Sequence, residues 1–262
     1  MTSLKILKRE FVYSILPFVV WEMFIMTTFV GNLYILGAFI GFALITTWII
    51  ASYHIHSYKS LSKYSDVIAT FRIRDKLFSN IVSPILLYSA LTWFLYVHNE
   101  MILEQLTIVA GVATFFLLFA QIRASYSHQF KIVKSTRIVF KLVDLIAFYA
   151  LVASVSMTGL SDLMTFIITS LIAFLLLLHQ LVIHRQYSQH ALIVFILSFG
   201  TMLLTGFYLL PLNYFIYPFM QSIIFYLLIS WWGVKLDGYN NISDYLPPLL
   251  FALMSFIILV SF

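Results

Sequence analysis

Long apolar stretches separated by short polar links are the dominant pattern of the chain. About 20 apolar residues, at about 1.5 Å rise per residue, cross a hydrocarbon core of about 30 Å as a helix. The pattern therefore predicts an all-α, polytopic membrane helix bundle. Its nine transmembrane helices fall at residues 11–30, 33–53, 81–98, 102–122, 138–158, 163–183, 191–210, 214–234 and 246–262. The last stretch is short and begins with Pro247-Pro248, and the count is eight if it enters the bilayer only partly.

The longest polar link, residues 54–80, carries a pattern of its own. Val67, Ile68, Phe71 and Phe78 fall near one face of a helix drawn over Asp66 to Phe78. An apolar stripe on an otherwise polar segment is typical of a short helix that lies in the membrane interface. We expect such a helix on the cytoplasmic side, and docking of a partner protein is the alternative.

The basic residues fix the expected orientation, because cytoplasmic links of membrane proteins carry an excess of Lys and Arg. With the N-terminus inside, all 15 Lys and Arg residues fall in inside segments and none in outside links. The first eight helices then form four outward hairpins, and one helix follows. The apolar stretch after the basic start lacks a small-residue cleavage site, so we expect this first helix to be retained. The membrane we expect is a bacterial cytoplasmic (inner) membrane.

Composition supports one integral membrane domain over residues 1–262. The chain is 62% hydrophobic and 10% charged, whereas soluble domains average about 25% charged residues. The net charge of +5 fits anionic lipid headgroups, and we expect no nucleic-acid partner. Cysteine is absent, which excludes disulfides, thiol catalysis and cysteine-ligated metals.

Glu22 is the most informative polar residue, because it falls inside the first apolar stretch. A charged group at the bilayer centre costs about 2.5–3.5 kcal/mol on insertion scales and usually faces a bundle interior or a water path. Pro17 precedes it by five residues and cannot donate to the carbonyl of Tyr13, which favours a local break. Ser14 lies on the same helical side. These residues predict a substrate or ion path; a protonated Glu22 that only joins helices is the alternative.

Gly37 and Gly41 form a GxxxG spacing in the second stretch, and this spacing lets a neighbouring helix approach closely. We therefore predict that these glycines serve helix–helix packing.

A buried polar pair is expected in the hairpin of the fifth and sixth stretches. Measured from the turn at residues 159–162, Asp144 lies about 16 residues back and His179 about 18 residues forward, so their depths match. We predict that Asp144 pairs with Lys141, with His179, or with both. Two interpretations of this pair remain open. It is either an ion pair that only fixes the hairpin or part of a functional site.

No cofactor, metal site or catalytic motif is predicted. The other histidines lie near the inner membrane face, where a metal- or phosphate-binding patch is a weaker possibility; they are His54, His56, His128, His184 and His190. The chain lacks a GxSxG nucleophile elbow, an HExxH zinc motif and a Gly-rich phosphate loop.

The leading functional prediction is a small transporter, flippase or channel-like protein with Glu22 in the translocation path. The alternative is a non-catalytic membrane subunit or scaffold, with protein subunits or further copies of the chain as partners in the lipid bilayer. An intramembrane enzyme that acts on a lipid, with Glu22 or Asp144 as acid or base, is a weaker third hypothesis. We lean against enzymatic activity.

Overall fold

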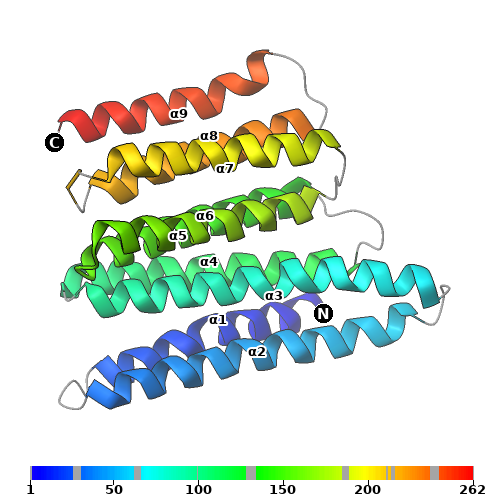
Figure 1. The fold of residues 1–262 in the computed structure, drawn as a ribbon. Helices are drawn as coiled ribbons and strands as arrows, with labels where there is room; N and C mark the ends of the chain where they lie inside the picture. Colours follow the sequence, from blue (N-terminus) through cyan, green and yellow to red (C-terminus); the bar gives the residue numbers. More distant parts are fainter. Residues whose placement is uncertain are drawn as a thin grey trace. The chain divides into compact units, whose positions relative to one another are not determined.

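A computed structural model describes residues 2–25, 31–61, 66–98, 100–127, 134–184, 189–210, 212–213, 216–236 and 242–261. Within these ranges the chain is all-α, with nine helices and no strand (Figure 1). The helices are α1 (Thr2–Ile25), α2 (Gly31–Leu61), α3 (Asp66–Val97), α4 (Met101–Ser127), α5 (Lys134–Met157), α6 (Asp162–His184), α7 (Gln189–Leu209), α8 (Ile216–Leu236) and α9 (Ile242–Ser261). Each predicted apolar stretch falls on one of these helices.

Six helices in the described part of the chain are long and apolar enough to cross a membrane, and they are α2 to α7. Shorter apolar segments occur at Glu10–Val20, Ile216–Trp232 and Tyr245–Ile257 of the remaining helices. The predicted all-α membrane fold is therefore confirmed. The number of helices that cross, and their direction, stay predictions.

The segment Asp66 to Phe78 does not form the separate short helix that the sequence pattern predicts. It is the first part of α3, which continues without interruption to Val97 and contains Pro84. Between Phe78 and the apolar stretch only Ser79 and Asn80 are polar, and neither stops a helix that has already formed. Pro84 removes one backbone hydrogen bond but leaves the helix continuous.

The chain divides into two compact units, residues 1–143 and residues 144–262, which we describe separately. In the first unit α1 packs against α2 and α4, α2 against α3 and α4, and α3 against α4. Aromatic rings fill its core: Trp48 of α2 stacks on Phe119 of α4 with ring centroids 3.9 Å apart, and Phe115 packs beside Phe119. Aromatic stacking thus joins α2 directly to α4.

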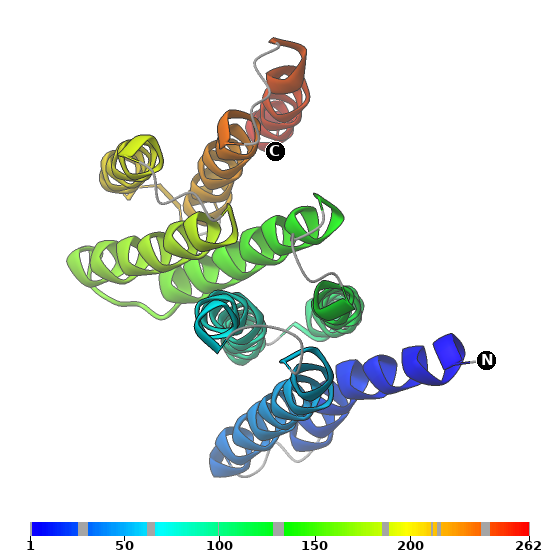
Figure 2. The same cartoon turned by 90° about the vertical axis from the view of Figure 1, so that its right-hand side faces the viewer.

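The second unit contains the end of α5 and all of α6 to α9. Phe148 of α5 stacks on Phe225 of α8 with centroids 4.5 Å apart. The indole of Trp232 on α8 donates a 2.7 Å hydrogen bond to the hydroxyl of Ser198 on α7, so this buried N–H is satisfied. Helix α9 lies alongside α8, as Figure 2 illustrates, and among the described residues it packs against no other helix.

Large apolar side chains cover much of the accessible surface of the helices. Ile102 and Leu106 on α4, Phe39 on α2 and Met254 on α9 are each more than 60% exposed. Water solvates such surfaces poorly, and exposed apolar patches of this kind mark contact with a membrane or a partner. The exposed surface is therefore the one that an integral membrane protein presents to lipid.

Candidate functional site

Polar and aromatic contacts join α1 to α4 along most of the length of the two helices. We call these residues the α1–α4 seam; they are Glu10, Phe18 and Glu22 of α1, and Gln105, Gly111, Phe115 and Arg123 of α4. The order of the contacts shows that the helices run antiparallel, because the early residue of α1 meets the late residue of α4.

One end of the seam is an ion pair. Nη1 of Arg123 donates to Oε1 of Glu10 over 2.7 Å. The Glu10 side chain is only 6% exposed and that of Arg123 is 26% exposed, so the carboxylate is the more deeply buried partner. Side chains on a helix lean toward its N-terminus. Arg123, near the end of α4, therefore reaches back along its helix toward Glu10. The second carboxylate oxygen of Glu10 is buried and has no hydrogen-bond partner in the described structure.

The middle of the seam is closed by apolar groups. Phe18 is buried and meets Phe115 edge to face, with centroids 5.8 Å apart. A Cβ atom at Gly111 would lie 2.7 Å from Cζ of Phe18 and 3.1 Å from Cδ1 of Leu91. This position therefore has room only for glycine, and Phe18 packs directly against the backbone of α4 there.

The other end of the seam holds Glu22. Its Oε1 accepts a 3.0 Å hydrogen bond from Nε2 of Gln105, four residues after the start of α4. Glu22 is half-buried and lies three residues before Ile25, the last residue described for α1, and its partner Gln105 is exposed. The carboxyl that the sequence singles out thus has an amide partner.

Ser14 and Pro17 are buried on α1 between the two carboxylates. The Ser14 hydroxyl donates 2.8 Å to the carbonyl of Phe11 within its own helix, and α1 continues through Pro17. The structure therefore brings Glu22 to Gln105, whereas the hydroxyl of Ser14 bonds within its own helix.

The sequence analysis missed Glu10, Gln105 and Arg123. Glu10 and Arg123 carry opposite charges at the ends of the first and fourth apolar stretches, on the side that the basic residues mark as inside. Comparing charges at equal depth on different helices would have found this pair. Gln105 gives no comparable signal, because a single amide near a helix start is common.

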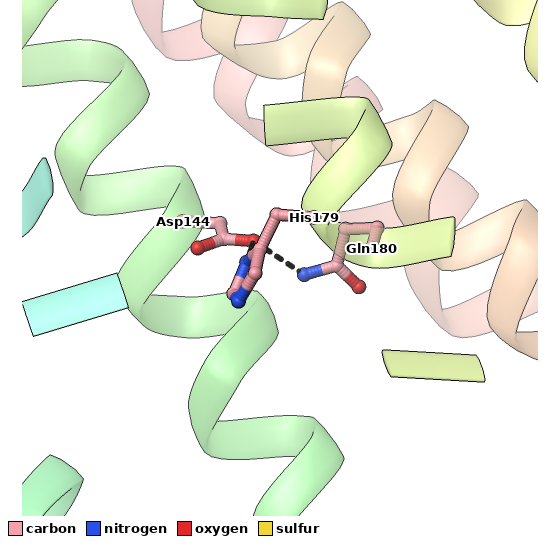
Figure 3. A network of polar contacts seen from close by, with 3 residues as sticks. All are labelled: Asp144, His179 and Gln180. Atoms are coloured by element: carbon pink, nitrogen blue, oxygen red, sulfur yellow. Dashed lines mark hydrogen bonds and ion pairs between the residues drawn. The ribbon is translucent and has the colours of Figure 1, made fainter. Parts of the chain in front are cut away.

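A second polar network lies in the other unit and joins α5 to α6 (Figure 3). Oδ2 of Asp144 is 2.7 Å from Nδ1 of His179 and accepts a second 2.7 Å hydrogen bond from Nε2 of Gln180. All three residues are at most 1% exposed. Figure 3 shows both α6 side chains pointing toward the carboxyl of Asp144, which lies on α5.

The structure thus brings together Asp144 and His179, the two residues whose depths match in the sequence. The two hydrogen bonds to Oδ2 of Asp144 both come from α6, one from His179 and one from Gln180. Lys141 lies three residues before Asp144 on α5 and is half-buried. Two donors on one oxygen hold the carboxyl in a fixed orientation within an apolar setting.

The predicted packing glycines lie on α2, and both are buried. Gly41 receives Tyr88 of α3, whose hydroxyl donates 3.1 Å to the carbonyl of Ala38. A Cβ atom at Gly41 would lie 2.7 Å from Cζ of Tyr88, and closer still to the hydroxyl oxygen. The close approach at Gly41 is therefore between α2 and α3.

Side chains of the five interfacial histidines lie outside the described part of the structure. Among the side chains that are described, no three His, Asp or Glu residues gather closely enough to hold a metal ion. Comparisons with protein-family models, curated proteins and solved structures find no match for the chain. Its class follows from its own fold: it is an α-helical integral membrane protein with two polar pairs along the α1–α4 seam and one buried polar network between α5 and α6.

Proposed function

We propose that the protein is a small transporter or channel-like protein, and that the α1–α4 seam is its translocation path for a proton or small cation. One observation carries the proposal: α1 carries two carboxyl groups, Glu10 and Glu22, and each meets a polar partner on α4. The carboxyls are 12 residues apart, a rise of about 18 Å. Ionisable groups inside membrane helices typically mark ion paths and proton relays.

Each part of the seam has a role in this proposal. Glu22, half-buried and held by Gln105, is the outer binding group. Glu10 is the inner one, and Arg123 balances its charge while the path is empty. Phe18 packed against Gly111 is the barrier between them. Pro17 lacks the N–H that would hold this turn of α1, and Ser14 supplies a hydroxyl between the barrier and Glu10.

The proposal includes the topology that the sequence predicts. Nine helices cross a bacterial cytoplasmic membrane, the N-terminus is inside, and four hairpins point outward. Because the chain has no cysteine, single cysteines can be introduced at Gly159 and Leu212 without a background signal. Both should react with a membrane-impermeant maleimide added outside whole cells. Reaction only after the cells are opened contradicts this topology.

The transport role can be tested with purified protein in vesicles that contain a pH-sensitive dye. A potassium diffusion potential set with valinomycin drives proton entry. We expect proton flux above that of protein-free vesicles, and we expect Glu22→Gln to reduce it at least tenfold while the yield of folded protein stays the same. Glu104→Gln is the matched control, because it removes a carboxylate from the first turn of α4 outside the seam.

Two results would oppose the proposal. The cation path is removed if the wild-type proton flux equals that of empty vesicles and if potassium flux, measured without valinomycin, also equals that of empty vesicles. A Glu22→Gln variant as active as Glu104→Gln removes Glu22 from the path.

A non-catalytic membrane subunit is the second candidate, and α9 supports it. This helix packs only against α8 among the described residues and exposes large apolar side chains such as Leu250, Phe251 and Met254. Such a face suits lipid, a partner subunit or another copy of the chain. Recovery of a stoichiometric partner after gentle solubilisation, together with an inactive protein in the vesicle assay, favours this candidate.

A further inference from the structure

A buried amide without a partner lies where α6, α7 and α8 meet, and it belongs to neither set of polar contacts described above. Gln221 of α8 is 2% exposed, and its Nε2 has no hydrogen-bond partner in the described structure. Burying an N–H donor without an acceptor is unfavourable, and a bound water or ligand is one way in which native proteins satisfy such a group.

A glycine borders this amide. A Cβ atom at Gly206 of α7 would lie 3.7 Å from Nε2 of Gln221 and 3.6 Å from Cε2 of Phe166 on α6. These are ordinary contact distances, so an alanine fits here without strain. An oxygen bonded to Nε2 would lie about 2.9 Å from it. An alanine methyl at Gly206 would therefore narrow the space beside the amide.

An acceptor lies one turn away on the same side of α8. The hydroxyls of Thr169 and Tyr217 lie 3.1 Å apart, and either of them can donate this hydrogen bond. In both cases a lone pair stays on the Tyr217 oxygen, four residues before Gln221. The two residues present a donor and an acceptor, both uncharged.

The place of the amide along the helices points to the chemistry of its ligand. Tyr217 and Gln221 lie in the first two turns of α8, and Gly206 lies three residues before the end of α7, so the amide is near one boundary of the bundle. Ester carbonyls of glycerolipids lie at this boundary, at the edge of the hydrocarbon core. The uncharged lining suits such a carbonyl better than a phosphate, which requires charged or multiple donors.

We propose that Gln221 binds the ester carbonyl of a glycerolipid that inserts between α6, α7 and α8. Phe166 is half-buried and meets the exposed Phe207 edge to face, with centroids 6.1 Å apart. This aromatic pair borders the amide and offers an apolar surface to the lipid's acyl chain. The proposal is independent of the transport path, because none of these residues belongs to the seam.

The test compares two bilayers that differ only in the carbonyl. The full-length protein is placed in nanodiscs of dioleoyl phosphatidylcholine or of its ether-linked analogue, which lacks the ester carbonyls. Native mass spectrometry then measures the lipid that stays bound. We expect about five times more bound lipid in the ester nanodiscs, and the side-chain amide NMR signal of Gln221 should differ between the two lipids.

Gly206→Ala should reduce bound ester lipid about fivefold, because its methyl group narrows the space beside Nε2 of Gln221. Gly200→Ala on the same helix is the matched control, since nothing lies within 4 Å of its Cβ position. Gln221→Leu should remove the difference between the lipids. Equal binding in both lipids, as expected if a single water occupies the amide, overturns the proposal. So does a Gly206→Ala variant that retains wild-type binding.

Discussion

Replacing Gly41 by alanine should destabilise the protein, although alanine favours a helix more than glycine does. The helix preference gains up to about 1 kcal/mol. Against it, the new Cβ meets the ring and hydroxyl of Tyr88, with Cζ only 2.7 Å away. Overpacking of this kind costs about 1–3 kcal/mol. Displacing Tyr88 also breaks its hydrogen bond to the Ala38 carbonyl, a loss of about 0.5–1.5 kcal/mol. The net loss of stability is about 0.5–4.5 kcal/mol.

The free energy of unfolding in mixed dodecyl maltoside and SDS micelles measures this effect. Gly200→Ala serves as the control for helix preference alone, because its Cβ position is open, and it should be neutral or stabilising. Adding Tyr88→Phe to Gly41→Ala removes the closest atom, so the double variant should lose less stability than the sum of the single variants. A Gly41→Ala protein as stable as the wild type would refute the close contact between Gly41 and Tyr88.

The two partners of the ion pair in the seam should contribute unequally to stability. Arg123→Leu leaves a nearly buried carboxylate without its partner and should lower the free energy of unfolding by about 3–5 kcal/mol. Glu10→Leu leaves a partly exposed guanidinium that can reach the membrane surface, so it should lower this free energy by less. Unfolding measurements on both single variants and the double variant give the coupling, and equal costs would contradict the burial difference. Asp144→Leu removes the acceptor of two buried donors, His179 and Gln180, and should cost about 3 kcal/mol. Asp144→Asn keeps an acceptor oxygen and should lose less stability than Asp144→Leu. If the same unfolding assay finds Asp144→Asn to be the less stable variant, the carboxyl does not accept both hydrogen bonds as described.

The sequence determined the helices because hydrocarbon imposes a length and a composition on any segment that crosses it. Each predicted stretch falls on a helix within its described residues, and the ends agree closely for α6, α7 and α8, whereas α2 ends well after its predicted limit and α3 begins well before its own. Depth could be counted in the same way, from a shared turn, and this count placed Asp144 level with His179 before any contact was known.

Only the tertiary structure decided which side of each helix faces a neighbour. In a soluble protein the apolar side of a helix points to the core, but lipid is as apolar as a core, so the sequence pattern cannot distinguish the two. The pairing of Glu22 with Gln105, the burial of Glu10 and the contact of Tyr88 with Gly41 all depend on this rotation. Residues that lie far apart in the sequence, on different helices, meet only when packing turns the correct sides of those helices toward each other. This packing is a property of the folded bundle.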